Sequence, residues 1–222
     1  MNGAGAAGDP HAGGRVLTWG PPLSPSVAAL IMVHGRGATA EDILELAPEI
    51  AGSTVSCLAP QASGRTWYPY PFLAPIAQNE PGISSGLGVL AALVRRALDA
   101  GVPAESIFLL GFSQGACLTL EFAARNARRY GGIIGLSGGL IGPDWTPRDY
   151  PGSMEGTPVF LGCSDRDPHI PKERVLLTRG VFTDLGAAVD ARLYPDMGHT
   201  VNEDEVLAVR AILSGAVRGI RQ

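Results

Sequence analysis

The chain has few cysteines, no long apolar run and no cluster of basic residues, and each absence excludes a class of protein. Its 222 residues include 3 Cys and no C-x-x-C pair, which argues against disulfides and zinc and favours a reducing, cytoplasmic environment. The longest apolar runs span about eight residues, too few to cross a bilayer. The 17 Lys and Arg are scattered in a chain of net charge −4, so we expect neither nucleic acid nor an anionic membrane as a partner.

The N-terminal residues 1–14 are rich in glycine and alanine, and they lack the basic start and the apolar stretch of a secretory signal. We expect them to form a disordered leader. Residues 15–222 suit a single domain with one well-filled core. No internal repeat, linker or second domain is apparent in this part of the sequence.

Strand-like and helix-like patterns alternate along this domain. The expected strands are Val16–Trp19, Val27–Val33, Thr54–Leu58, Ser106–Leu110, Gly132–Leu136, Pro158–Leu161 and Ala188–Tyr194. The expected helices are Ala40–Ile50 with the cap Thr39, Ser85–Ala100 ending at Gly101, Gln114–Tyr130, Lys172–Leu185 ending at Gly186, and Asn202–Val217 with the cap Asn202. Most strands are continuously apolar, which is typical of strands buried on both faces. The pattern predicts an α/β fold with a mostly parallel sheet of about seven strands and helices on both faces, with ligands at the carboxyl ends of the strands.

The most informative segment is residues 111–115, GFSQG, which lie between an expected strand and an expected helix. This is the layout of a nucleophile elbow, in which a serine stands at the tip of a turn so sharp that glycine is needed two residues to either side. The helix behind the turn directs backbone N–H groups toward the place where an oxyanion would form. The segment predicts Ser113 as the nucleophile of a serine hydrolase.

A second G-x-S-x-G match, residues 135–139, has Ser137 at its centre. Because 30 residues are glycine, the motif alone is weak evidence, with about 0.24 matches arising by chance, and the context has to decide between the two. Residues 138–152 contain four Gly and three Pro, which cannot open a helix. We therefore interpret Ser137 as a turn residue at the end of a strand.

The general base is sought among four histidines. His11 lies in the leader, and His34 reads as a packed structural residue. His199 lies in a loop between the last strand and the last helix, after Ser113, where the chain order of such hydrolases places the base. Its alternative role is a cap of that helix, and His169 is the rival base.

The acid that would orient the base lies in the loop after the strand Pro158–Leu161, where Asp165 and Asp167 flank Arg166. Arg166 has the charge to pair with one of them, and the residues alone do not choose between the two carboxylates.

The oxyanion hole and the pocket follow from two other loops. One N–H donor is expected from Gln114, directly after the nucleophile, and the other from the glycine-rich loop 33–39. Residues 60–82 contain five Pro and four aromatics. Aromatic side chains in a loop would expose much apolar area unless they line a pocket, so we expect Trp67 and Tyr68, together with Gly35, in its wall.

Taken together, residues 34–37 (HGRG), 111–115 (GFSQG), 164–171 (SDRDPHIP) and 197–199 (MGH) resemble the phospholipase/carboxylesterase family of α/β hydrolases, which includes acyl-protein thioesterases. The resemblance implies the α/β-hydrolase fold. In the family's D-x-D-P-x-[VI]-P pattern the second aspartate is the catalytic acid, which implies Asp167 here. It also implies oxyanion donors at the backbone N–H groups of Arg36 and Gln114.

Acyl-protein thioesterases typically carry an aliphatic residue where this chain has Arg36, and the chain looks more like the small bacterial esterases of the family. The sequence thus predicts a serine esterase for small, short-chain esters, with the triad Ser113, Asp167 and His199 and with neither cofactor nor metal. Three alternatives are weighed against it. A long apolar tunnel would favour a thioesterase or lysophospholipase. A dienelactone-hydrolase-like enzyme would have Cys at the elbow, and a non-catalytic binding module would have a damaged triad. Assembly as a homodimer stays open.

Overall fold

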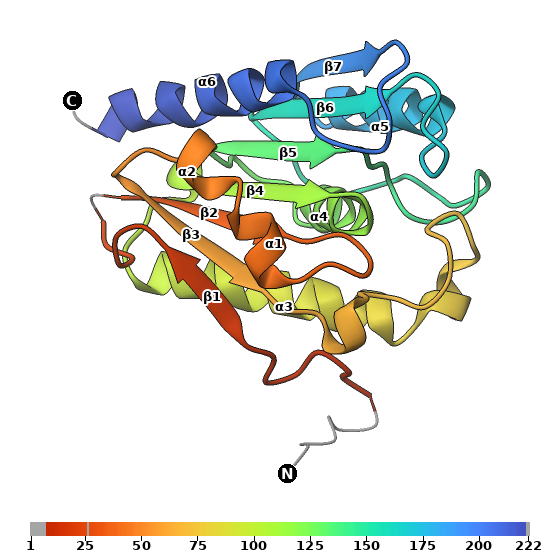
Figure 1. The fold of residues 1–222 in the computed structure, drawn as a ribbon, viewed down its shortest axis with the longest axis horizontal. Helices are drawn as coiled ribbons and strands as arrows, with labels where there is room; N and C mark the ends of the chain where they lie inside the picture. Colours follow the sequence, from red (N-terminus) through yellow and green to blue (C-terminus); the bar gives the residue numbers. More distant parts are fainter. Residues whose placement is uncertain (1–7, 26, 221–222) are drawn as a thin grey trace.

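A seven-stranded sheet forms the centre of the molecule in a computed structural model that describes residues 8–25 and 27–220. The strands are β1 (Val16–Trp19), β2 (Ala28–Val33), β3 (Val55–Pro60), β4 (Ile107–Phe112), β5 (Gly132–Leu136), β6 (Pro158–Ser164) and β7 (Ala188–Tyr194). Their order is β1-β3-β2-β4-β5-β6-β7, in which β1 is antiparallel to β3 and all other neighbours are parallel (Figure 1). The predicted sheet is confirmed.

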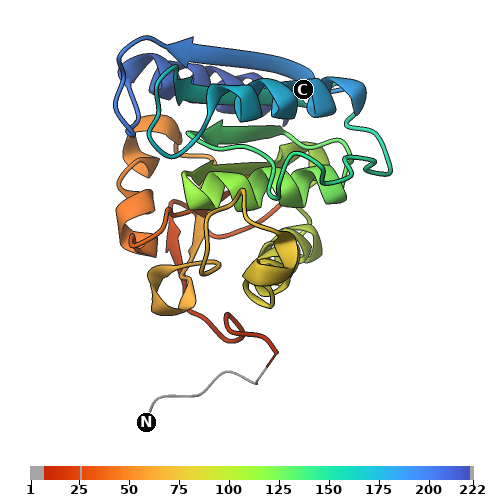
Figure 2. The same cartoon turned by 90° about the vertical axis from the view of Figure 1, so that its right-hand side faces the viewer.

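Helices cover both faces of this sheet (Figure 2). The α-helices of the described residues are α1 (Ala40–Leu44), α2 (Ala47–Ile50), α3 (Gly82–Asp99), α4 (Gln114–Arg125), α5 (Lys172–Asp184) and α6 (Glu203–Ile220). Buried side chains of α3, α4 and α5 share one hydrophobic cluster, and those of α1, α2 and α6 share the other. The sheet is therefore buried on both sides, which explains why its parallel strands read as continuous apolar runs.

Two helices differ most from the prediction, beside shifts of up to three residues at the ends of α3 and α6. The expected helix 40–50 is two short helices, because Pro48 at the start of α2 has no N–H and its ring would clash with the carbonyl of Leu44 in a continuous helix. The helix after Ser113 ends at Arg125 rather than at Tyr130. There the Asn126 side chain donates to the Phe122 carbonyl at 2.9 Å, and the Tyr130 N–H donates to the hydroxyl of Thr157, the residue before β6. The first difference arises because Pro48 has no backbone donor, and the second because the donor of Tyr130 has its partner outside the helix.

The helix caps agree with the sequence. Thr39 and Asp42 form a reciprocal capping box at α1, and Asn202 accepts from the Glu205 N–H at the start of α6. Gly101 and Gly186 follow α3 and α5 with φ of 84° and 80°, the left-handed conformation that glycine adopts at little steric cost. These local signals fix where the chain turns.

The N-terminal segment packs against the domain over its described part. Residues 1–7 lie outside the described residues, but His11 is only 4% exposed. Its Nε2–H donates to the Trp67 carbonyl at 2.9 Å, and its Nδ1 accepts from the Ser63 N–H at 3.1 Å. Instead of belonging to a disordered leader, His11 is held by polar contacts that the glycine-rich composition of the segment does not reveal.

The site-bearing loops extend from one edge of the sheet. The strands β4 to β7 end at the same side of the molecule, and the connections 61–81 and 137–157 leave β3 and β5 there (Figure 1). No helix among residues 8–25 and 27–220 is long and apolar enough to cross a membrane.

Candidate active site

Ser113 stands at the turn between β4 and α4 with φ 54° and ψ −120°, a conformation that non-glycine residues rarely adopt. The flanking glycines are required by backbone contacts. A Cβ on Gly111 would lie 2.4 Å from the Gly115 carbonyl oxygen, and one on Gly115 would lie 2.2 Å from the Val33 carbonyl oxygen. The predicted strand–turn–helix elbow is confirmed.

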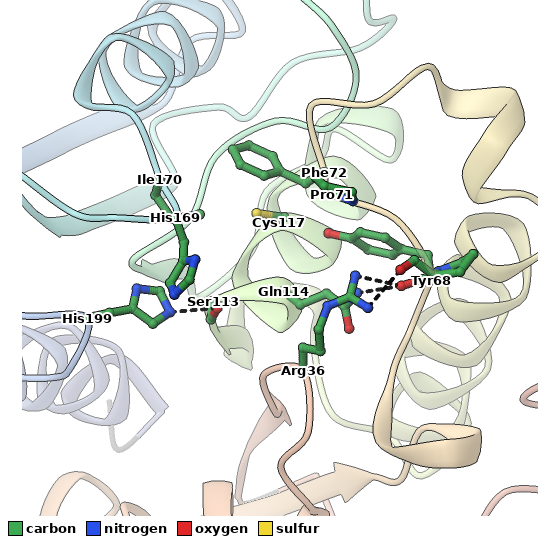
Figure 3. A pocket seen from close by; sticks show the side chains of 11 residues that line it. Arg36, Tyr68, Pro71, Phe72, Ser113, Gln114, Cys117, His169, Ile170 and His199 are labelled. Carbon is green, nitrogen blue, oxygen red and sulfur yellow. Dashed lines mark hydrogen bonds between the residues drawn. The ribbon is translucent and has the colours of Figure 1, made fainter.

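A chain of hydrogen bonds runs from Ser113 to Asp167. Ser113 Oγ lies 2.8 Å from His199 Nε2, and His199 Nδ1 lies 2.7 Å from Asp167 Oδ2 (Figure 3 shows the first of these). An ionised carboxylate can only accept, so Nδ1 carries the hydrogen. Nε2 is then left as the acceptor of the Ser113 hydroxyl, which is the arrangement needed to remove the serine proton.

The Asp167 carboxylate is held in one orientation and in its charged form. Its side chain is fully buried, and its Oδ1 accepts from the N–H groups of His169 at 2.8 Å and Ile170 at 3.0 Å. Burial alone would raise the pKa of Asp167, but the hydrogen bonds from His199 and these two amides outweigh it, and the pKa lies below its usual value.

The other carboxylate of this loop points elsewhere. Asp165 accepts from the Asp196 N–H at 3.2 Å and so joins its loop to the loop before His199. Arg166 pairs with Asp196 at 3.6 Å rather than with either of its neighbours, and both partners are exposed. The structure thus places Asp167 on His199 and leaves Asp165 as a loop-bracing residue.

The remaining histidines contact the site without joining the hydrogen-bond chain. His34 is fully buried, donates from Nδ1 to the Gly35 carbonyl at 2.8 Å and accepts at Nε2 from the Ala62 N–H. Burial lowers its pKa, so it is a neutral structural residue as predicted. His169 packs edge-on against His199, with 4.8 Å between ring centroids. Its ring braces the base rather than replacing it.

The Arg36 side chain binds the pocket wall. Its guanidinium donates to the carbonyls of Tyr68, Pro69 and Tyr70, each at 2.9 Å (Figure 3 includes Tyr68). The positively charged guanidinium is thus paired with no carboxylate among the described residues and is instead hydrogen-bonded to three successive backbone carbonyls of one loop segment. Arg36 therefore acts as a brace for the wall, a role that the sequence did not suggest.

The Gln114 side chain holds the same segment from the other side. Its Nε2 donates to the Tyr68 carbonyl at 2.8 Å, and its Oε1 accepts from the Trp67 N–H at 2.9 Å and from the Thr66 hydroxyl at 3.3 Å. The two residues whose backbone N–H groups are the predicted oxyanion donors, Arg36 and Gln114, are thus tied by their side chains to one stretch of loop. We call these contacts the Arg36–Gln114 brace.

A cavity of about 370 Å³ opens beside Ser113. Figure 3 shows side chains from the loops after β2, β6 and β7, from the elbow and α4, and from residues 66–72, which we call the wall loop, converging on it. Its lining residues are Arg36, Tyr68, Pro69, Pro71, Phe72, Ser113, Gln114, Cys117, His169, Ile170 and His199. The wall is mostly apolar, and none of these residues is acidic. Such a cavity suits a small ligand that has one reactive polar group.

The other predicted pocket residues lie around the cavity rather than in its wall. Trp67 is fully buried behind the wall, where its Nε1–H donates to the His34 carbonyl at 2.9 Å. Gly35 lines a neighbouring depression, and a Cβ there would lie 3.3 Å from the Ser113 Cβ. Sequence reasoning missed Cys117, although its place one helical turn after Ser113 is a readable signal.

Comparisons with known proteins agree with this fold and indicate a family. A family model described as phospholipase/carboxylesterase matches residues 21–216. Acyl-protein thioesterase 1 of Yarrowia lipolytica is 28% identical over 205 residues, which are 84% of this chain and 90% of that protein. The crystal structure of a phospholipase/carboxylesterase from Dyadobacter fermentans is 43% identical and has a TM-score of 0.87, with 90% of this chain and 96% of that chain covered. The Bacillus cereus carboxylesterase, 18% identical with a TM-score of 0.71 and 92% of this chain and 95% of that chain covered, shares the fold.

Proposed function

The chain belongs to the phospholipase/carboxylesterase family of α/β hydrolases, and from that premise we propose that it is a serine esterase that hydrolyses short-chain carboxylic esters through an acyl-enzyme. Membership indicates a hydrolase of esters or thioesters. The nucleophile, its partners and the acyl length are the parts we propose. The observation that carries them is the hydrogen-bond chain from Ser113 through His199 to Asp167 at a cavity.

In the first half of the reaction, Ser113 Oγ attacks the ester carbonyl while His199 Nε2 takes its proton. Asp167 keeps the other ring nitrogen protonated and stabilises the imidazolium that forms. The negative oxygen of the tetrahedral intermediate is stabilised by the backbone N–H groups of Arg36 and Gln114. The second of these begins α4, whose dipole favours negative charge there. His199 then gives its proton to the leaving alcohol.

In the second half, water replaces the alcohol and repeats the steps on the acyl-enzyme. His199 takes a proton from the water, whose oxygen attacks the acyl carbonyl, and returns it to Ser113 as the acid leaves. The Arg36–Gln114 brace supports both halves. Because both side chains are held by the wall loop, the two backbone donors keep one orientation as charge develops beside them.

The size of the cavity supports short acyl groups. At the volume that each molecule occupies in liquid water, about 370 Å³ holds about a dozen non-hydrogen atoms. Each added methylene gains about 0.8 kcal/mol only while apolar wall covers it. We therefore expect kcat/KM to be greatest between acetate and hexanoate and to fall steeply by decanoate.

A second candidate is a thioesterase or lysophospholipase acting on long acyl chains, which the similarity to acyl-protein thioesterase 1 favours. Rates on p-nitrophenyl esters from acetate to palmitate, measured below the micelle limit, separate the two. A value of kcat/KM that still rises from octanoate to palmitate would select this candidate and reject the short pocket. The same acyl groups offered as thioesters then determine which leaving group is preferred, and Ser113→Ala gives the background rate.

A further inference from the structure

The hydroxyl of Tyr68 is a buried polar group that the proposed mechanism does not use. The Tyr68 side chain lines the cavity and only 2% of the residue is exposed. Its hydroxyl has no nitrogen or oxygen hydrogen-bond partner among the described residues, and the Cys117 thiol is the group it interacts with. Figure 3 shows the ring reaching in from the wall loop with its hydroxyl toward Cys117. Buried hydroxyls in native proteins are normally paired with a hydrogen-bond partner. A polar atom of a ligand in the cavity would supply such a partner for the Tyr68 hydroxyl.

The backbone beneath this ring is held in place. The Tyr68 carbonyl accepts from Arg36 and from Gln114, and the preceding N–H donates to Gln114. These bonds fix the backbone from which the ring extends, and the packing of a residue that is only 2% exposed holds the ring itself. The Tyr68 backbone is thus tied to the same two residues whose backbone N–H groups are the predicted oxyanion donors.

The surroundings of the hydroxyl select what it can bind. Cys117, next to it, offers only a thiol, a weak hydrogen-bonding group, and burial raises the pKa of this thiol to about 12. Phe72, Pro71 and Ile170 make the rest of this wall apolar. Burial also raises the pKa of Tyr68 well above its usual value, so the phenol remains a neutral donor.

Charged groups of both signs act on Tyr68. The Arg36 guanidinium acts on it more strongly than the negative charge of Glu121, which is 1% exposed. Its own oxygens bind Arg125, Tyr150 and the Ile141 N–H, so they do not occupy the Tyr68 hydroxyl. A neutral ether, hydroxyl or keto oxygen can accept from the phenol without bringing a second negative charge toward Glu121.

We propose that the Tyr68 hydroxyl is a specificity-determining donor that binds a neutral oxygen on the acyl chain of the substrate, so that esters of short alkoxy-, hydroxy- or oxo-acids are preferred to plain aliphatic ones. The proposal rests on the proposed function and narrows its substrate class. An ether oxygen and a methylene have similar size, so the apolar wall accepts both, and the hydroxyl gains an oxygen acceptor in place of the weak thiol only with the oxygenated chain.

The test compares p-nitrophenyl hexanoate with analogues in which one chain methylene at a time is replaced by an ether oxygen. For each analogue the ratio of its kcat/KM to that of hexanoate is measured in the wild type, in Tyr68→Phe and in the matched control Tyr70→Phe, a residue that is 53% exposed. Comparing ratios between proteins cancels the inherent reactivity of each ester. We expect the ratio at one chain position to fall about 3- to 10-fold in Tyr68→Phe, as for loss of one neutral hydrogen bond. It should keep its wild-type value in Tyr70→Phe.

A second variant tests the proposal even if Tyr68→Phe does not fold. Cys117→Ser gives the Tyr68 hydroxyl a strong internal partner, and we expect it to lower the same ratio while Tyr68 is retained. Ratios that agree between wild type and both variants at every chain position overturn the proposal. Failure of the proposed function is distinct from this, because it would appear as Ser113→Ala hydrolysing hexanoate as fast as the wild type.

Discussion

The two G-x-S-x-G turns of this protein have nearly the same backbone and different surroundings. They follow adjacent parallel strands, and both serines have positive φ, 54° at Ser113 and 51° at Ser137. The backbone N–H of each serine extends the hydrogen bonding of the sheet. The Ser113 N–H donates to the Leu136 carbonyl at 2.9 Å, and the Ser137 N–H donates to the Gly162 carbonyl at 2.7 Å. A strained serine at the end of a strand therefore occurs twice, side by side.

The surroundings of the two hydroxyls differ. Ser113 opens α4, lines the cavity and bonds to His199. Ser137 is fully buried, has no nitrogen or oxygen partner among the described residues, and lies beside the Cys163 thiol. Residues 138–152 after it form no helix. The comparison teaches that backbone strain marks a turn, whereas a nucleophile also needs a base, a cavity and a helix N-terminus.

The sharpest way to break this comparison is to remove each hydroxyl in turn. We expect Ser113→Ala to lower kcat about 10⁴- to 10⁶-fold, because the attacking group is lost. Ser137→Ala should leave kcat within a few-fold. The measurement is kcat on p-nitrophenyl butyrate, with thermal unfolding as a check of the fold. The opposite ranking would assign the nucleophile to the second turn.

The next largest effect concerns the two carboxylates of the loop after β6. Asp167→Asn is expected to lower kcat about 10³- to 10⁴-fold, since an amide can hold the wrong tautomer of His199. Asp165→Asn, which touches only the Asp196 N–H, should cost far less. Equal losses of kcat at equal stability would contradict the role of Asp167.

The glycines before the two serines provide a comparison in stability. A Cβ on Gly111 meets the Gly115 carbonyl at 2.4 Å, whereas one on Gly135 meets the end of the Leu120 side chain at 2.8 Å. Backbone cannot move aside as a flexible side chain can, so we expect Gly111→Ala to lower the free energy of unfolding by about 3 kcal/mol or more and Gly135→Ala by about 1 kcal/mol. Urea unfolding of both variants measures these free energies. Similar decreases in the two variants would contradict the prediction and show that the backbone at the elbow moves to accommodate the added Cβ.

The smallest expected effect is a pH dependence near the second turn. Glu205 packs against Gly162, whose carbonyl accepts the Ser137 N–H, and burial raises the pKa of Glu205 to about 7 from its usual value of 4.5. Between these two values the folded protein binds more protons than the unfolded chain, so the free energy of unfolding should decrease as pH rises from about 4.5 to about 7. The loss is on the order of 2 kcal/mol.

The control for this dependence is Glu205→Gln, which cannot titrate. Urea unfolding at pH 5 and pH 8 should show a smaller difference in this variant than in the wild type. A wild-type protein that is no less stable at pH 8 than at pH 5, after subtraction of the variant, would contradict the raised pKa.

Local signals in the sequence were sufficient for the scaffold of the site. The strand before Ser113, the two flanking glycines and the helix behind it are neighbours in the chain, so steric limits over a few residues specify the elbow. Capping at Thr39 and the glycines after α3 and α5 work over the same short range. The order of strands and helices then implied which loops meet at one edge of the sheet.

Local signals did not specify which side chains meet there: the choice of Asp167 came only from the resemblance to a family, and the contacts themselves belong to the tertiary structure. Ser113 and His199 are separated by 86 positions, and the choice of Asp167 over Asp165 as the partner of His199 depends on how the loop after β6 folds back. The contacts of Arg36 with the wall loop, and the burial of Trp67 behind that wall, likewise join segments about thirty residues apart. Composition and periodicity carry no record of such pairings, because they arise from the packing of elements and from each buried donor finding an acceptor within reach.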